Sequence, residues 1–415
     1  MAAKHNVLVL CLLAAFISCK KSDTKKPAVT TGNKLVLNLA EQQKAVTDNS
    51  FTFKLFDNLA AGNSNGSNLF ISPLSVSIAM AMTSNGAAGQ TLTAIDSAMD
   101  FNGFTQAELN SYYNKLITQL PALDPNTTLN IANSIWYRQG FDVLSPFIST
   151  DSNYYKAEIS ALDFTSPTAV TTINNWVSNN TNGKITRIIQ SIPPAEEMYL
   201  INALYFKSSW QESFDPSKTQ TLPFYVSVGN TVQAPLMTGK IDINSYYDAN
   251  VTVFELPYSG ATYSMVIIVP QGSKTPIDVK NSLNQNQWQT WMSALKPTQQ
   301  QVTLPKFTYS YGTSLNDALT AMGMGVAFSD GANFSKISTQ GLKISDVEHK
   351  AYIAVDESGT EAAAVTSVGV TATDVPAIQP DYNVNRPFIF AIRERNSGLV
   401  LFAGLVNNPL LTGSN

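Results

Sequence analysis

The chain has 415 residues, of which 44% are hydrophobic and 10% aromatic, so it can bury one large core or a few smaller ones. Its formal net charge is −4 and no basic run follows Lys26, which argues against nucleic-acid and heparin-like partners. Both cysteines, Cys11 and Cys19, stand near the N-terminus. The rest of the chain therefore offers neither a disulfide bond nor a cysteine nucleophile.

An export signal is expected at the N-terminus. A basic start and the apolar run from Val7 to Ile17 lead to a small residue and then to Cys19. This pattern predicts a secretory signal peptide over residues 1–18. It is similar to the leader of bacterial lipoproteins, with Cys19 as the lipidated first residue, although Phe16 stands where that motif usually has Leu. An ordinary cleaved signal peptide with an incidental cysteine is the alternative.

The segment after the leader is rich in Lys, Ser, Thr, Pro and Gly, a composition typical of flexible tethers. We assign residues 19–45 to the lipidated cysteine and its tether, and residues 46–415 to one folded domain. No segment beyond the leader approaches the roughly 20 apolar residues that span a bilayer. The expected product is an exported bacterial lipoprotein, anchored in the membrane through Cys19 and facing the periplasm or the cell exterior.

Helical patterns dominate the first half of the chain and strand patterns the second. Apolar residues spaced for one helical face follow residue 50, and Ser72-Pro73 predicts the start of a buried helix that continues to Met82. A near-continuous β-branched run from Tyr263 to Val269 predicts a central strand covered on both faces. Because strands and helices do not alternate regularly, the class is α+β. Further strands are expected over 129–137, 199–206, 351–355 and 399–406, and a further helix over 281–295.

Conventional catalytic motifs are absent from the sequence. There is no Gly-x-Ser-x-Gly elbow, no Walker-type phosphate loop and no histidine pair for zinc, so neither a cofactor nor a metal is expected. After leader removal His349 is the only histidine, and a Ser–His–Asp triad would have to use it, beside Asp346 and Glu348. A buried, hydrogen-bonded core histidine is the favoured interpretation. A secreted hydrolase that uses His349 is the weakest alternative.

The segment from Val355 to Thr371 combines features of a strand and of a loop. Its residues are mostly small or β-branched, and alternate positions separate into a small-to-apolar face that begins at Thr360 and a more polar face that begins at Glu361. Prolines and aspartates follow at once, from residue 374 to 381, and are typical of an exposed loop. A segment with the composition of a strand and the position of a loop predicts two alternative conformations.

This segment and six others resemble the serpins, the serine protease inhibitor superfamily. The resemblance covers roughly residues 49–409, and the segments occur in the family's order, which makes the set specific although each is weak alone. It implies a single domain with three β-sheets, eight or nine helices and an exposed reactive loop. The six other segments are Asn68–Ser75, Ile173–Val177 with Thr181–Ile185, Ile201–Lys207 with Trp210 and Phe214–Pro216, Pro305–Phe307, Leu342–Lys350 and Asn385–Phe390.

The resemblance implies roles for particular residues around a main sheet. At the top of this sheet Lys306 would pair with Glu357, Trp210 would pack nearby, and Gly359 would take unusual backbone angles where the loop leaves the strand. The hinge of the reactive loop would comprise Glu357, Gly359, Thr360, Glu361, Ala362, Ala363 and Ala364. The shutter, a polar cluster beneath the middle of the sheet, would comprise Ser72, Ser75, Asn202 and His349.

The implied activity is inhibition of a serine protease. The target would cleave the loop, the hinge would enter the main sheet as a new strand, and the enzyme would stay trapped in a covalent complex; loop insertion by serpins is itself a standard example of this physics. A hinge free of prolines and of bulky inward residues from Thr360 to Thr366 favours an inhibitor, which we expect to be a monomer. A non-inhibitory relative that serves as a binding or storage protein is the alternative.

The cleavage site is expected near the end of the small-residue segment. The family's usual spacing, counted from Glu357, places the reactive bond between Thr373 and Asp374. The distance to Pro387 on the far side is longer than usual, so any bond from Val370 to Val375 stays open. Small, uncharged residues here suit elastase-like or subtilisin-like proteases, whereas recognition of Asp374 itself would suit an aspartate-directed protease.

Overall fold

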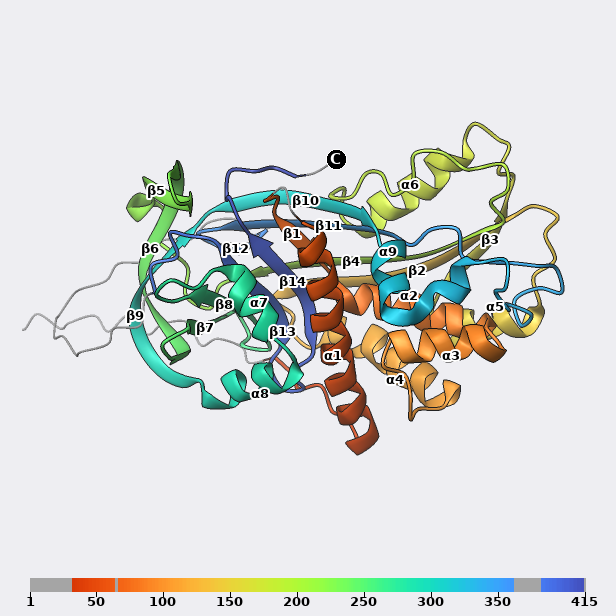
Figure 1. Cartoon of the computed structure of the whole chain (residues 1–415), viewed down its shortest axis with the longest axis horizontal. Helices are drawn as coiled ribbons and strands as arrows, with labels where there is room; N and C mark the ends of the chain where they lie inside the picture. Colours follow the sequence, from red (N-terminus) through yellow and green to blue (C-terminus); the bar gives the residue numbers. More distant parts are fainter. Residues whose placement is uncertain (1–31, 64–65, 362–381, 414–415) are drawn as a thin grey trace, which may run out of the picture.

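The computed structural model describes residues 32–63, 66–361 and 382–413. A six-stranded sheet runs along the long axis of the molecule, and most helices gather toward one end of it (Figure 1). Helix α6 lies on one face of this sheet and α2 on the other (Figure 1). The described residues contain nine α-helices: α1 (Leu39–Gly62), α2 (Pro73–Gly86), α3 (Gly89–Ala98), α4 (Gln106–Gln119), α5 (Ser145–Tyr155), α6 (Ala169–Asn180), α7 (Pro276–Ser282), α8 (Gln285–Ala294) and α9 (Asn316–Leu319).

The six-stranded sheet, called the main sheet from here on, has the strand order β10-β11-β12-β4-β2-β3. Its neighbours are antiparallel except β2 and β3, which are parallel. The very short β12 is therefore an interior strand that separates β11 from β4. The strands are β10 (Phe307–Ser314), β11 (Glu348–Asp356), β12 (Gly359–Thr360), β4 (Met198–Ser209), β2 (Thr127–Arg138) and β3 (Glu158–Leu162).

The other eight strands are hydrogen-bonded into one connected network, in which the long strand β6 joins two further sheets. Residues 230–236 of β6 pair with β5, residues 236–245 with β9 and residues 244–247 with β7. The predicted α+β fold with three sheets is therefore confirmed, whereas most of the predicted reactive loop, residues 362–381, lies outside the described residues. These strands are β1 (Leu69–Ile71), β14 (Val400–Val406), β13 (Phe388–Glu394), β8 (Tyr263–Pro270), β7 (Val251–Pro257), β6 (Asn230–Tyr247), β5 (Gln220–Ser227) and β9 (Lys296–Pro305).

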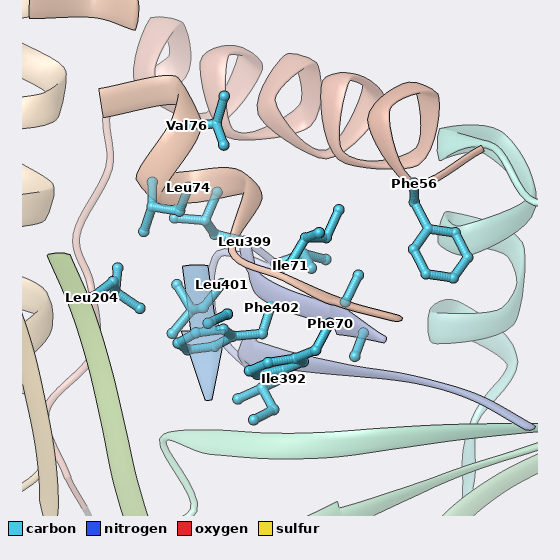
Figure 2. Close-up of a cluster of buried hydrophobic side chains, with 14 of the residues drawn as sticks. Phe56, Phe70, Ile71, Leu74, Val76, Leu204, Ile392, Leu399, Leu401 and Phe402 are labelled. Carbon is cyan, nitrogen blue, oxygen red and sulfur yellow. The ribbon is translucent and has the colours of Figure 1, made fainter. Parts of the chain in front are cut away.

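The core lies between the main sheet and the sheet that contains β13 and β14. Every residue of β1, β13 and β14 is buried, as their apolar sequences predict. The rings of Phe70 and Phe402 stack with centroids 5.2 Å apart, and Phe206 of the main sheet packs edge-on against Phe402 at 6.3 Å. Figure 2 shows the first two rings in one cluster with Leu74 of α2 and Leu204 of β4. Each such side chain contributes about 1.5–3 kcal/mol, which gives the main sheet a fixed base.

One expected element is divided. The helix expected over 281–295 is two helices, α7 and α8, with a break at Leu283 and Asn284. The Asn284 side chain accepts hydrogen bonds from the backbone N–H groups of Asn286 and Gln287, both at 3.0 Å, and so starts a new helix. The other expected elements correspond to α1, α2, β2, β4, β8, β11 and β14.

The folded part of the chain begins before residue 46. Leu35 and Leu37 are buried, and Asn38 and Glu41 form a reciprocal capping box that starts α1 at Leu39. The segment 19–45 that we assigned to the tether is thus partly folded, because a helix cap and two buried leucines lie within it. No helix in the described ranges is long and apolar enough to cross a bilayer.

Candidate functional site

The first residues of the predicted hinge are already part of the main sheet. Gly359 and Thr360 form β12, which pairs with Asp356 and Val355 of β11 on one side and with the end of β4 on the other. Thr360 is 2% exposed, so its side chain faces the core. We expected the loop to leave the strand at Gly359; in the structure, strand pairing continues through Thr360. Two residues of the predicted hinge are therefore paired within the main sheet of the intact chain.

Two aromatic side chains hold Thr360 in place. Its hydroxyl forms a 2.6 Å hydrogen bond with the hydroxyl of Tyr258. The ring of Tyr258 stacks on the predicted packing residue Trp210, with centroids 4.7 Å apart and planes 8° from parallel. The Trp210 Nε1–H in turn donates to the carbonyl of Asp356, at the end of β11. Sequence analysis missed Tyr258, because only the tertiary fold brings it from the β7–β8 turn to the hinge.

Position 359 requires glycine for two reasons, which are its backbone angle and its close contact with strand β4. Its φ of +155° is one that L side chains rarely adopt. A Cβ at this position would lie 2.2 Å from the carbonyl oxygen of Ser208 in the neighbouring strand β4. The glycine therefore lets the hinge approach β4 closely, which is a different role from the expected one at the point where the loop leaves the strand.

An ion pair lies at the top of the main sheet, beside β12. Lys306 Nζ donates to Glu357 Oε2 at 2.7 Å, and the Thr219 hydroxyl donates to the other carboxylate oxygen at 2.7 Å. Burial alone would raise the pKa of Glu357, but the hydrogen bonds from Lys306 and Thr219 outweigh it and hold this pKa below its usual value. The carboxylate thus stays charged while it caps the strand end from which the hinge begins.

The main sheet is open farther along the same two strands. Below β12, no ladder joins β4 directly to β11 in the part of the chain that the structure describes. A cavity of about 1090 Å³ lies there instead, lined by residues 198–202 of β4 and residues 348–351 of β11. Val76 and Ala79 of α2 are among its apolar lining residues. The cavity lies between two strand edges that have no neighbouring strand among the described residues, which is a place where a strand can be added.

Three of the four predicted shutter residues, Ser75, Asn202 and His349, line this cavity, and the fourth, Ser72, contacts His349. The backbone N–H of Ser72 donates to His349 Nε2 at 3.2 Å, and the Ser75 hydroxyl donates to the Asn202 carbonyl at 3.4 Å. The Asn202 side chain donates to the Asn133 side chain at 2.7 Å, across the β2–β4 pair. Asn133 was not predicted, because a buried asparagine in an apolar strand shows its role only once the facing strand is known. The cluster connects α2, β4 and β11.

His349 does not form a catalytic triad. Burial lowers its pKa to about 4, so the imidazole is neutral at pH 7 and its Nε2 accepts a backbone hydrogen bond. Asp346 accepts instead from the Ser314 hydroxyl at 2.5 Å, and no carboxylate bonds to His349 among the described residues. A neutral histidine that is occupied by a backbone donor fits the core role that we favoured.

The remaining predicted site residues lie outside the described residues. They are Cys19, Ala362, Ala363, Ala364, Thr373 and Asp374. Within the described ranges no group of three or more His, Cys, Asp and Glu side chains has the arrangement of a metal site.

Comparison with known proteins places this geometry in a family. Residues 46–409 match the family model described as "Serpin (serine protease inhibitor)". Iripin-3 of Ixodes ricinus is 36% identical over 358 residues, which cover 83% of this chain and 90% of the relative. Serpin A3-3 of Bos taurus is 33% identical over 372 residues, with 88% and 89% covered.

Comparison with solved structures finds the same similarity. The thermophilic serpin tengpin in its native state superposes with a TM-score of 0.80 at 34% identity, over 91% of this chain and 97% of that one. Human thyroxine-binding globulin, solved in complex with thyroxine, superposes with a TM-score of 0.80 at 30% identity, over 89% and 99%. The match extends over the sheet, the hinge strand and the shutter alike, and the chain belongs to the serpins, a family of serine protease inhibitors and not of enzymes.

Proposed function

We propose that this chain inhibits serine proteases as a suicide substrate, by cleavage of its reactive loop and insertion of the hinge into the main sheet. The observation that carries the proposal is the position of Thr360, which is seated between β4 and β11 on the same strand edges as the cavity. A strand that has started at one end of an open gap can lengthen residue by residue, because each step adds ladder hydrogen bonds on both sides.

The register of β12 predicts where later hinge residues would go. Because β12 is antiparallel to both neighbours, each later residue would meet an earlier residue of β4 and of β11. On this register Thr366 would lie between Asn202 and His349, in the shutter. The Asn202–Asn133 bond and the Ser72–His349 bond show that both sides of the gap there carry polar partners. A hydroxyl that arrives between them could be satisfied rather than buried unpaired.

The length of the gap fits the length of the small-residue segment. On the same register the ladder would end at Ser367 opposite the start of β11 and at Val370 opposite the start of β4. The expected reactive bond, between Thr373 and Asp374, would thus lie just beyond the sheet. If each of these residues gains about 1 kcal/mol net, complete insertion would release on the order of 10 kcal/mol, enough to distort an attached enzyme.

The proposed targets are elastase-like or subtilisin-like proteases, because the residues around the expected bond are small and uncharged. The test is incubation of the purified protein with a panel of such enzymes, together with a trypsin-like and an aspartate-directed protease. An inhibitor yields an enzyme–protein complex that survives denaturing electrophoresis, and mass spectrometry of the released peptide identifies the bond. Cleavage by every active protease without any stable complex would contradict the proposal.

A non-inhibitory binding protein is the second candidate. It is favoured by one observation, the similarity to thyroxine-binding globulin in complex with thyroxine. The two candidates differ in what loop cleavage does. An inhibitor should become markedly more resistant to heat when its hinge inserts, whereas a carrier that does not insert its hinge should melt at an unchanged temperature.

We also propose that the protein is an exported bacterial lipoprotein, with Cys19 as the lipidated residue and the membrane as a second partner. The leader pattern supports this, and a folded part that starts near residue 32 leaves about a dozen residues as a tether. Replacement of Cys19 by Ala should move the protein from the membrane fraction to the soluble fraction. A wild-type protein that is already wholly soluble would rule lipidation out.

A further inference from the structure

Glu361 is the residue at which the hinge leaves the main sheet. Its backbone N–H still donates to the carbonyl of Ala354 at 3.0 Å, so the β12–β11 ladder continues up to this point. Its φ is +55°, a left-handed conformation that non-glycine residues adopt at a cost and that turns the chain out of the sheet. Such a conformation persists only where surrounding contacts stabilise it.

Those contacts come from the side chain of Glu361. The Tyr205 hydroxyl donates to Glu361 Oε2 at 2.8 Å, and Lys184 Nζ lies 3.6 Å from the same oxygen. The Glu361 side chain is only 5% exposed, so these two partners offset the cost of burying its carboxylate. Burial, followed by the hydrogen bond to Glu361, raises the pKa of Tyr205 to about 12, so its hydroxyl stays protonated and able to donate. We call Lys184, Tyr205 and Glu361 the hinge anchor.

The anchor connects the hinge to both flanking strands and to α6. Tyr205 belongs to β4, and its hydroxyl accepts a hydrogen bond from Asn182 at 3.4 Å. Lys184 follows α6 and lies 4.9 Å from the ring centroid of Tyr352 in β11. The turn that carries Asn182 and Lys184 is fixed by Thr181, whose hydroxyl accepts from the backbone N–H of Ile185 at 3.1 Å. A helix that covers the main sheet therefore holds the point at which the hinge stops.

Further insertion and this anchor exclude each other. To extend β12, Glu361 would have to change from the left-handed to the extended conformation. The register would then place it beside Lys207 of β4, one side-chain step away from its present partner Tyr205. The contacts that Glu361 makes now thus belong to a single state, in which Gly359 and Thr360 are paired in the main sheet and Glu361 is not extended.

We propose that Lys184 and Tyr205 are positioning residues for the reactive loop: they hold the hinge at two inserted residues, and so set both how far the loop reaches toward a protease and how readily the hinge continues into the sheet. This inference rests on the proposed inhibitory function for its kinetic consequence, but the position of the hinge can be measured without any protease. Loss of the anchor destabilises the half-inserted state, so the loop is released more often and insertion after cleavage begins more easily.

The test uses two single variants, Tyr205→Phe and Lys184→Gln, in the intact chain. Tyr205→Phe keeps the buried ring and removes only the hydroxyl that donates to Glu361. Its matched control is Tyr246→Phe, which removes a hydroxyl that donates to Asp248 at 2.8 Å, outside the main sheet. Lys343→Gln is the control for Lys184→Gln, because Lys343 pairs only with the exposed Asp330. Lys184→Arg keeps the charge and serves as the rescue variant.

Amide hydrogen exchange of the hinge is the first readout. We expect the amide of Glu361 to exchange about three- to tenfold faster in Tyr205→Phe and Lys184→Gln, the range for loss of one hydrogen bond of ordinary net strength. Lys184→Arg and both controls should match the parent. Unchanged exchange in both anchor variants overturns the proposal, whether or not the protein inhibits any protease. Should Tyr205→Phe fold poorly, Lys184→Gln and Glu361→Gln test the same contacts without any change to the buried aromatic ring.

The association rate with a target protease is the second readout. The anchor variants should associate several-fold faster than the parent, while their fraction of cleaved, untrapped inhibitor stays equal or falls. A purely structural role would lower the melting temperature and leave this rate unchanged, which would contradict positioning. If the parent traps no protease at all while hinge exchange responds as expected, the proposed inhibitory function fails and the anchor stands.

Discussion

The upper and lower halves of the main sheet differ in what lies between strands β4 and β11. At the upper end β12 fills the space between β4 and β11, with Thr360 buried and Glu357 paired to Lys306. At the lower end the same strands border a cavity of about 1090 Å³ instead of a ladder. At the upper end a short strand joins β4 to β11, and at the lower end no described strand does. The difference teaches that the space between these two strands can hold a strand and that, among the described residues, only its upper end does so.

The largest effect is expected from blocking entry of the hinge into the main sheet. Thr360→Arg, at the occupied end, or Ala362→Pro, just beyond it, should convert an inhibitor into a substrate, with covalent complex reduced about tenfold or more. Arg would bring a cation beneath the sheet, and Pro would remove a ladder donor from a central strand. The measurement is the ratio of trapped enzyme to cleaved protein. Ala363→Arg, on the outward face, is the matched control and should retain inhibition; equal inhibition by all three variants would show that the strand does not enter the sheet.

Filling the vacant half should stabilise the whole domain. Cleavage of the loop by a protease outside the target panel should raise the melting temperature by roughly 15 °C or more, because several residues each add about 1 kcal/mol of ladder and packing. Scanning calorimetry of intact and cleaved protein measures the change. Ala362→Pro, cleaved in the same way, should gain little. An unchanged melting temperature for the cleaved parent would favour the binding-protein alternative.

His349 makes the lower half sensitive to acid. Its folded-state pKa of about 4 lies below the ordinary value of about 6.5, so its contribution to stability is complete above pH 6.5 and is lost as the pH falls toward 4. Urea unfolding should therefore show a loss of about 2 kcal/mol between pH 7 and pH 5. His349→Gln, which keeps an acceptor for the Ser72 N–H, should flatten the profile. A parent curve that is flat over this range would contradict the burial of this imidazole.

The smallest effect is expected at the completed end. Glu357→Lys places two cations side by side at the top of the sheet, where the intact pair joins a half-exposed Lys306 to a largely buried Glu357 and contributes about 1 kcal/mol. The melting temperature should change little, but mild heating should produce more latent or polymeric protein on native gels. Reversal of the exposed pair Lys343–Asp330 by Lys343→Glu is the control. Identical gels for both variants would rule out a gating role for the Lys306–Glu357 pair.

The sequence predicted the hinge better than the residues that contact it. The hinge is visible in the chain, because small residues on alternate positions from Thr360 onward have the pattern of a strand, and prolines and aspartates typical of a loop follow them. The partners of the hinge are not visible. Tyr258, Tyr205 and Thr219 come from three different strands or turns, and nothing in their local sequence marks them as neighbours of residues 357–361.

Sequence rules also mispredict the ends of elements where tertiary contacts determine them. Periodicity alone joined α7 and α8, although the cap at Asn284 was readable as a helix start. Composition extended the tether to residue 45, although Leu35 and Leu37 pack into the core. That the hinge would enter the sheet before cleavage depends on the glycine contact between Gly359 and Ser208, which only the folded structure shows.

Amide hydrogen exchange before and after loop cleavage tests the central claim most directly. In the intact protein, the amides of residues 362–370 and those on the open edges of β4 and β11 should exchange quickly, while Thr360 and Glu361 are protected. After cleavage, residues 362–370 should become as protected as the core strands, and the lower parts of β4 and β11 should gain protection with them. If residues 362–370 still exchange quickly in the cleaved protein, the hinge has not filled the main sheet and the proposed mechanism is wrong.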